Sequence, residues 1–434
     1  MSVIELNGTQ QTALRNVDKW ISGNEGKQIY ALAGYAGTGK SVLARNILRM
    51  LKGKKRSVVP AAPTGVAAYV MASKGIEGAQ TLDKVLFVHE PVPEYDQNGD
   101  PLFDRHGDPV VRRFVTRPKT AGEFDPNTVF MIDEASMLRK DMARQLLVLG
   151  FPVLTIYDPQ QLAPPGTSPT DPDLLRFAPS LAQADTVLAD IMRQSDGTGH
   201  GARIVKAAMR LRHDDATVLS VADAYDIPRF PKFSSKYDKL VAKYPDMAII
   251  CATNSQVINH NNRARQLRGF NPNNPLFQKG EPIQVVQNQY RVEVAEDADD
   301  VQDAMDVEDR RFMYAANGQG AVVASDPVWV KGEAAIECDV TWDMSGETTR
   351  EHFMVEDLIH DESHPLYLAA QEEQPCGRTR AFAIKATLAH AMTCHKSQGR
   401  EFTRVLIALP PNLPDNRWSY TALTRASENV AICK

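Results

Sequence analysis

Residues 34–41 of this 434-residue chain read GYAGTGKS, a pattern that could hold the phosphates of a nucleotide. The glycines allow a tight turn that points successive backbone N–H groups at phosphate oxygens, and we assign Gly37 and Gly39 to nucleotide binding. Lys40 supplies a positive charge for the β- and γ-phosphates, and Ser41 offers its hydroxyl to Mg²⁺. The segment therefore predicts ATP and Mg²⁺ as ligands.

The sequence around this segment supplies the elements that a phosphate-binding loop needs. The apolar residues 29–33 precede it and predict a buried strand, and residues 41–51 carry apolar side chains at helical spacing. The N-terminus of that helix would face the phosphates and add a favourable dipole. The alternative, a glycine-rich turn that binds nothing, is disfavoured by this strand–loop–helix context.

Two carboxylates and an amide follow predicted strands further along the chain. Asp133 and Glu134 end the apolar run 128–132; Asp133 would hold Mg²⁺ and Glu134 would polarise the attacking water. An Asp-Glu pair after an apolar run is common, but its place downstream of the phosphate-binding segment strengthens the assignment. Gln161 follows the strand predicted at 153–157 and could sense a γ-phosphate; the alternative is a polar turn without a ligand.

Two arginines and one polar segment complete the set of candidates. Arg193 and Arg425 could stabilise charge on a transferring phosphoryl group, although a lone arginine is most often a surface charge. In residues 393–402, hydroxyl, imidazole and ammonium groups stand close together. Such groups suit contacts with a phosphodiester backbone, and the alternative is an exposed polar loop.

The elements that must position these residues alternate between helices and short apolar strands. A parallel sheet with helices on both faces is the expected result, so we predict an α/β fold. In the first alternating region the strands are predicted at residues 29–33, 57–62, 128–132 and 153–157. A second alternating region begins near residue 191, and its strands are predicted at residues 247–252, 405–409 and 430–433.

Two segments interrupt this alternation. Residues 88–126 contain two Gly-Asp-Pro turn signals and predict an inserted hairpin. Residues 281–385 are rich in short β-like runs and predict a small β-barrel insertion. Within it, residues 293–309 are strongly acidic, which favours a solvated loop over a DNA mimic or a partner site.

The composition limits the classes of protein to consider. A net charge of −5 does not by itself indicate nucleic-acid binding, although a basic groove can coexist with acidic outer faces. The five cysteines include no C-x-x-C pair, which argues against a zinc site or a disulfide framework and for a reducing compartment. No apolar stretch is long enough to cross a membrane, and the N-terminus does not have the pattern of a signal peptide.

Taken in order, these segments resemble the motifs of superfamily 1 helicases, specifically the 1B branch that includes RecD and the phage Dda helicase. Residues 393–401 match T-x-H-K-x-Q-G-x-E, and residues 420–425 match Y-x-x-x-T-R. These two motifs are the specific part of the resemblance, because a phosphate-binding loop alone serves many functions. Residues 34–41, 62–68, 133–137 and 158–165 resemble motifs I, Ia, II and III of the family.

The resemblance implies two RecA-like domains with ATP bound in the cleft between them. It places the first domain, 1A, at residues 1–87 and 127–190 and the second, 2A, at residues 191–280 and 386–434. It also makes residues 88–126 a strand-separating pin domain, 1B, and residues 281–385 an SH3-like domain, 2B.

The resemblance also implies roles for single residues. Gln10 would read the adenine, Lys40 and Ser41 would bind phosphate and Mg²⁺, and the two arginines would reach across from the second domain. Phe103 or Phe114 would be the wedge that parts the strands of a duplex. Contacts to single-stranded DNA would come from Thr64, Thr393, His395 and Lys396.

The function that follows is an ATP-dependent DNA helicase that moves 5′ to 3′ on single-stranded DNA. Two alternatives stay open: a DNA-stimulated translocase that does not unwind, and a P-loop nucleotide kinase or nucleotide-gated scaffold. Single-stranded and forked DNA are the expected partners, and a replisome or single-strand-binding protein is a candidate partner. We expect the protein to be a monomer that does not associate with a membrane. Its expected location is the cytoplasm of a bacterium or phage-infected cell, and its expected role is in DNA replication.

Overall fold

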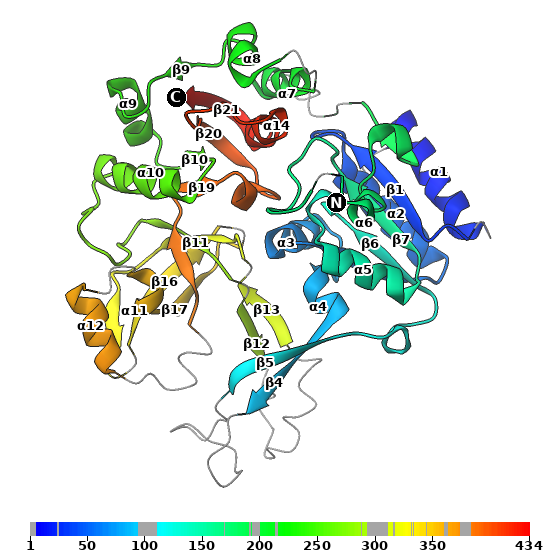
Figure 1. Cartoon of the computed structure of the whole chain (residues 1–434), viewed down its shortest axis with the longest axis horizontal. Helices are drawn as coiled ribbons and strands as arrows, with labels where there is room; N and C mark the ends of the chain where they lie inside the picture. Colours follow the sequence, from blue (N-terminus) through cyan, green and yellow to red (C-terminus); the bar gives the residue numbers. More distant parts are fainter. Residues whose placement is uncertain are drawn as a thin grey trace. The chain divides into compact units, whose positions relative to one another are not determined.

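A computed structural model of the chain divides into two compact units (Figure 1). The first unit comprises Met1–Val88, Arg117–His260 and Ala391–Lys434, and the second comprises His89–Thr116 and Asn261–His390. We describe each unit by itself. The residues that the structure describes are 6–23, 26–93, 111–168, 170–190, 192, 200–212, 216–287, 289–292, 311–315, 317–330, 332, 334–343, 345–359, 363–373 and 383–434.

The first unit contains a six-stranded parallel sheet with the strand order β3-β2-β6-β7-β1-β8. β1, β6 and β7 are buried along their whole length, as expected for strands that are covered on both faces. The strands are β1 (Ile29–Gly34), β2 (Ser57–Ala62), β3 (Gln80–Thr81), β6 (Thr128–Ile132), β7 (Val153–Tyr157) and β8 (Thr186–Leu188).

Helices cover both faces of this sheet and form two separate apolar cores with it. One core includes Ala13, Ile47 and Ala68, which come from α1, α2 and α3. The other includes Val85 and Leu146, which come from α4 and α5. The helices are α1 (Gly8–Ser22), α2 (Lys40–Gly53), α3 (Gly65–Ser73), α4 (Leu82–Leu86), α5 (Lys140–Leu149) and α6 (Pro172–Leu175), with short 3₁₀ turns η1 (Ala121–Glu123), η2 (Ala135–Met137) and η3 (Leu181–Gln183).

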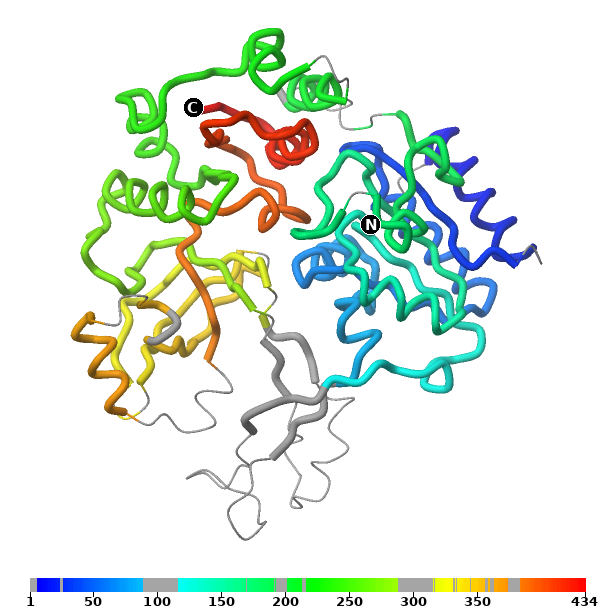
Figure 2. The backbone as a smooth tube through the Cα atoms, in the orientation of Figure 1, coloured from blue at the N-terminus to red at the C-terminus, as the bar shows by residue number. Residues whose placement is uncertain are grey.

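A second parallel sheet in the same unit has the strand order β19-β10-β20-β21-β9. Figure 2 shows how the end of the chain, in orange and red, returns to lie beside the green strand β10. The strands are β9 (Arg229–Phe230), β10 (Ala248–Cys251), β19 (Ala391–Thr393), β20 (Phe402–Ala408) and β21 (Ala426–Cys433). The helices of this part are α7 (His200–Arg210), α8 (Val218–Ala224), α9 (Ser235–Lys243), α10 (Asn254–Leu267) and α14 (Asn416–Leu423), and η5 spans His395–Ser397. Two parallel sheets confirm the predicted α/β class.

The second unit is built from antiparallel strands around its own apolar core. Its main sheet has the order β15-β16-β14-β11-β18, with β17 also paired to β16. Burial alternates along β16, so one face of that strand packs on the core. The elements are β11 (Pro282–Val285), β14 (Gly320–Val323), β15 (Val328–Val330), β16 (Ala335–Trp342), β17 (Thr348–Met354), β18 (Ala386–Leu388), α11 (Val355–Leu358) and α12 (Pro365–Glu372).

Two further strand pairs border segments that the structure does not describe. β12 (Gln289–Val292) pairs with β13 (Arg311–Ala315), and β4 (Phe87–Pro93) pairs with β5 (Val111–Pro118). The acidic run 293–309 and Phe103 lie outside the described residues, and Phe114 lies on β5 with no described side chain. The strand-separating and SH3-like identities of these insertions therefore stay predictions.

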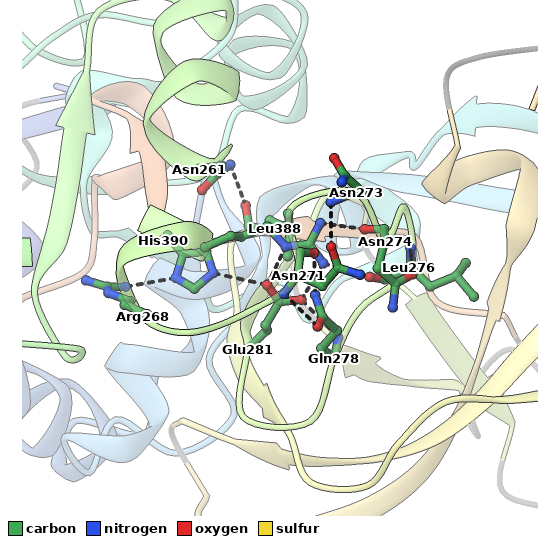
Figure 3. Close-up of polar contacts among 11 residues, drawn as sticks. Asn261, Arg268, Asn271, Asn273, Asn274, Leu276, Gln278, Glu281, Leu388 and His390 are labelled. Carbon is green, nitrogen blue, oxygen red and sulfur yellow. Dashed lines mark hydrogen bonds and ion pairs between the residues drawn. The ribbon is translucent and has the colours of Figure 1, made fainter. Parts of the chain in front are cut away.

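A buried ionic cluster lies in the second unit (Figure 3). The guanidinium of Arg265 donates to both carboxylate oxygens of Glu281, at 2.5 and 2.8 Å. His390 Nε2 lies 3.4 Å from the same carboxylate, and Arg268 Nη1 lies 2.8 Å from His390 Nδ1. Burial lowers the pKa of His390, so its ring is neutral near pH 7, with Nδ1 accepting from Arg268 and Nε2–H directed at Glu281.

The carboxylate of Glu281 is charged in this cluster, and its partners explain why. Burial acts to raise its pKa, but hydrogen bonds from His390 and Arg265 outweigh burial and hold the pKa below its usual value. Gln278 N donates to the carboxylate as well, at 2.9 Å. Arg265 has further acceptors in two backbone carbonyl oxygens, those of Asn274 at 2.7 Å and Leu276 at 2.8 Å.

Among the helices in the described segments, none combines the length and the apolar character needed to cross a membrane.

Candidate nucleotide site

The phosphate-binding segment lies between β1 and α2, as the sequence predicts. Gly37 and Gly39 have φ angles of 80° and 78°, in the left-handed region that a side chain disfavours. Lys40, the first residue of α2, donates from Nζ to the carbonyl oxygens of Gly34 at 2.7 Å and Tyr35 at 3.0 Å. The loop therefore presents a helix N-terminus and an ammonium group at one place.

Gln10 lies against this loop and is buried. It belongs to a capping box at the start of α1, in which its Oε1 accepts from Asn7 N at 3.1 Å and its backbone N–H donates to Asn7 Oδ1 at 2.8 Å. Its Nε2 donates to Thr38 O in the loop, at 3.3 Å. Each of these bonds leaves capacity on the side-chain amide, one lone pair on Oε1 and one hydrogen on Nε2, which the predicted reading of adenine would use.

We expect Gly39→Ala to weaken nucleotide binding by about tenfold or more. An added Cβ would lie 2.4 Å from Gln10 Nε2, and the left-handed backbone would strain alanine by about 1–2 kcal/mol. Titration with a fluorescent ATP analogue measures the affinity. Gly150→Ala is the matched control, because Gly150 has a φ of 76° but open space around its Cβ position. Equal affinity of Gly39→Ala and the wild type would show that this close approach does not shape the site.

The two carboxylates follow β6 in a strained turn. Glu134 has a φ of 52°, which is uncommon for any residue but glycine and often marks a functional site. Its backbone N–H donates to Asp133 Oδ1 at 2.9 Å, and its Oε2 is buried without a hydrogen-bond partner among the described residues. Burial and the neighbouring Glu134 raise the pKa of Asp133 to about 6.

The donor set of this turn fits a bound magnesium nucleotide. A buried carboxylate oxygen without a partner is costly, so a partner from outside the chain is expected at Glu134. Carboxylate and hydroxyl oxygens, as in Asp133 and Ser41, are the hard ligands that Mg²⁺ prefers.

The segment after β7 carries the predicted γ-phosphate sensor. Gln161 is buried, and its Oε1 has no hydrogen-bond partner in the described part of the chain. The segment is joined to the carboxylate turn, because Ser136 Oγ donates to Asp158 O at 2.8 Å and accepts from Asp158 N at 3.3 Å. Glu134 Oε2 and Gln161 Oε1, the two buried oxygens without a described partner, therefore lie in segments that are hydrogen-bonded to each other.

The predicted arginines have different outcomes. Arg193 lies outside the described residues. Arg425 is buried, and its guanidinium donates to Thr421 O at 3.2 Å, Arg400 O at 3.0 Å and Thr424 Oγ1 at 3.3 Å. These three bonds direct the guanidinium of Arg425 at acceptors in and near α14. Its contact with a phosphoryl group therefore stays a prediction.

The predicted DNA contacts lie at the ends of strands in both sheets. Thr64 follows β2 and caps α3, accepting from Ala67 N at 3.3 Å. Thr393 ends β19, and its hydroxyl accepts from Lys396 N at 3.4 Å. Burial lowers the pKa of both His395 and Lys396, which share the short turn η5.

The sequence interpretation missed three side chains that join the two sheets. Tyr420 Oη accepts from Ala36 N at 3.1 Å, Thr421 Oγ1 accepts from Leu162 N at 3.2 Å, and Gln398 Nε2 donates to Leu162 O at 3.0 Å. All three belong to the motif V and VI segments, so the signal was present in the sequence. Pattern matching gave those positions no partner, because their partners are more than 200 residues away in the chain.

Comparisons with known proteins agree with this architecture. A family model described as "AAA domain" matches residues 5–227, which is more than half of the chain, and one described as "UvrD-like helicase C-terminal domain" matches residues 388–433. A search of curated proteins gave no match.

The solved structures that match include several Pif1 helicases, and at this level of identity they show a shared fold. Pif1 helicase from Candida albicans is 17% identical with a TM-score of 0.54, and the match covers 99% of this chain and 94% of that one. Pif1 from Bacteroides bound to single-stranded DNA is 17% identical with a TM-score of 0.51, covering 99% and 92% of the two chains. A Bacteroides Pif1 complex with ADP-AlF3 and single-stranded DNA gives the same identity and coverage, with a TM-score of 0.50. The chain therefore belongs to the AAA-domain family, matches a UvrD-like helicase C-terminal domain over residues 388–433, and shares the fold of the Pif1 helicases.

Proposed function

We propose that the chain is an ATP-dependent DNA helicase that moves 5′ to 3′ on single-stranded DNA and unwinds duplex ahead of it. The observation that carries this proposal is a pair of buried oxygens, Glu134 Oε2 and Gln161 Oε1, that have no hydrogen-bond partner among the described residues and follow the neighbouring strands β6 and β7. Two side chains of α14, Tyr420 and Thr421, accept hydrogen bonds from the loop and from the Gln161 segment. Hydrolysis at this place can therefore be coupled to movement of the second sheet.

Each side chain of the site has a proposed part in hydrolysis. Lys40 would release the loop carbonyls that it now contacts and bind the β- and γ-phosphates. Glu134 would orient the attacking water and take its proton, and Gln161 would hydrogen-bond to the γ-phosphate. Mg²⁺ held by Ser41 and Asp133 would neutralise phosphate charge. Arg193 and Arg425 would stabilise charge on the transferring group.

The DNA contacts are proposed at Thr64, Thr393, His395 and Lys396. Support comes from their place in the two sheets and from the single-stranded DNA present in the Bacteroides Pif1 complexes. Such backbone contacts would bind DNA without strong sequence preference and with strong dependence on salt. The 5′→3′ direction and a wedge at Phe103 or Phe114 rest on the sequence resemblance.

ATP hydrolysis with and without single-stranded DNA is the first test, with Lys40→Ala as the blank. We expect strong stimulation by DNA in the wild type and none in the blank, because Lys40 supplies the charge that the phosphates need. Stimulation should fall steeply as salt rises. DNA-independent hydrolysis would instead favour a nucleotide kinase or a nucleotide-gated scaffold.

Unwinding and direction need a second assay on the same protein. Duplexes with a 5′ or a 3′ single-stranded tail should be separated only from the 5′ tail. DNA-stimulated hydrolysis without strand separation on either substrate would leave a translocase that does not unwind.

A further inference from the structure

We propose that Tyr420 is a positioning residue that holds the Gln161 segment against the phosphate-binding loop. The inference rests on the proposed ATPase function and assigns a role to a residue that contacts neither nucleotide nor DNA in that proposal. Tyr420 lies on α14 and is 1% exposed. Its hydroxyl is hydrogen-bonded to both segments at once: to Ala36 N at 3.1 Å and to Asp158 Oδ2 at 2.8 Å.

The direction of the two hydrogen bonds follows from the atoms. A backbone N–H can only donate, so the hydroxyl accepts from Ala36 and must give its own proton to Asp158. Burial and the carboxylate of Asp158 raise the pKa of Tyr420, which keeps that proton on the phenol. Asp158 also accepts from Gln160 N at 3.0 Å. The fully buried carboxylate thus accepts from two donors, one of them the Tyr420 hydroxyl on α14.

Both ends of the segment that carries Gln161 are fixed by adjacent residues of α14. Tyr420 holds Asp158 at one end, and Thr421 accepts from Leu162 N at the other. Gln398 adds a bond to Leu162 O. Gln161 lies between these anchors, and its Oε1 has no hydrogen-bond partner among the described residues, so α14 fixes both ends of the segment that carries this side chain.

The loop is held by a second contact next to the first. The guanidinium carbon of Arg212, just after α7, lies 4.1 Å from the ring centroid of Tyr35, the neighbour of Ala36. A shift of α14 would therefore move the Gln161 segment and the loop together. This gives the second sheet a direct means to align the sensor with the phosphates.

Tyr420→Phe tests the proposal, because it removes the hydroxyl and keeps the ring. We expect the kcat of DNA-stimulated ATP hydrolysis to fall about 10- to 100-fold, since the hydrogen bond to the buried carboxylate of Asp158 is lost together with the one from Ala36 N. The KM for ATP should change less than about twofold, because phosphate binding itself is untouched. The matched control is Tyr237→Phe, which removes another buried hydroxyl, 2.7 Å from His260 Nδ1 and outside the proposed site.

Asp158→Asn reaches the same hydrogen bond from its other partner. The double variant Tyr420→Phe/Asp158→Asn should lose little more than Tyr420→Phe alone, because that single variant already lacks the Tyr420–Asp158 hydrogen bond that Asp158→Asn weakens. Additive losses, or a Tyr420→Phe kcat equal to that of the wild type, would overturn the positioning role. A thermal unfolding midpoint close to that of Tyr237→Phe would show that the loss is not a loss of folding.

The outcomes also separate this inference from the function on which it rests. A wild type that hydrolyses ATP only with DNA, and a Tyr420→Phe variant with unchanged kcat, would overturn the inference alone. A wild type without DNA-stimulated hydrolysis would overturn both.

Discussion

Glu134→Gln should lower the rate of ATP hydrolysis by about 10²- to 10⁴-fold and leave ATP binding close to that of the wild type. Glutamine has the shape of glutamate but cannot take a proton from the attacking water. Glu134 Oε2 is buried with no hydrogen-bond partner in the described part of the chain, and the residue has a left-handed backbone just after β6. Strain and an orphaned oxygen are both costs that a catalytic role explains.

Single-turnover hydrolysis and nucleotide titration on the same variant separate the two effects. Glu123→Gln is the matched control, because Glu123 is a half-exposed carboxylate in the same unit that hydrogen-bonds to Arg117 and Thr120. It should keep the turnover of the wild type. Turnover within about threefold of the wild type in Glu134→Gln would remove Glu134 from the role of general base.

The parts of the fold that the sequence predicts well are those that depend on local pattern. The strands predicted at 128–132 and 153–157 have the same bounds as β6 and β7, and the one predicted at 29–33 is one residue shorter than β1. Each is a continuous apolar run, which a strand buried on both faces requires. The glycine positions were also predictable, because left-handed backbone favours glycine at Gly37 and Gly39.

The rest of the fold depends on contacts between distant parts of the chain. β3 and β9 have two residues each and β8 has three, too few to show a periodic pattern. The strand order of the first sheet is set by packing between distant segments, and the local sequence pattern does not predict it. The site shows the same division: Lys40 and Glu134 could be found from their motifs, while the bonds of Tyr420 to Ala36 and Asp158 could not.

The buried pair Arg265–Glu281 belongs to the part that the sequence does not predict, and its removal should have the largest effect on stability. Arg265→Met should destabilise the second unit by about 3–5 kcal/mol, because Glu281 would keep a buried charge without its guanidinium partner. Both side chains are almost inaccessible, at 4% and 0% exposure. Hydrogen–deuterium exchange of the β11 and β18 amides reports unfolding of this unit separately from the first.

Arg350→Met is the matched control in the same unit. Arg350 pairs with Asp339 at 2.8 Å, but its side chain is 62% exposed. Loss of such a surface pair should cost far less stability than loss of the buried pair, because solvent screens the two charges. A cost for Arg265→Met as small as for Arg350→Met would mean that water reaches Glu281 and the pair is not truly buried.

The double replacement Arg265→Met/Glu281→Leu decides what the pair contributes. Burying two charges costs their hydration free energy, and the attraction between them only offsets that cost. A protein with apolar side chains of similar volume in their place can therefore be as stable. We expect the double variant to recover most of the stability lost in Arg265→Met. Any shortfall then measures the remaining bonds of the two side chains, because His390 and the backbone N–H of Gln278 would lose their acceptor and the carbonyls of Asn274 and Leu276 would lose their donor. A double variant no more stable than Arg265→Met would show that those donors, rather than the arginine, depend most on the carboxylate.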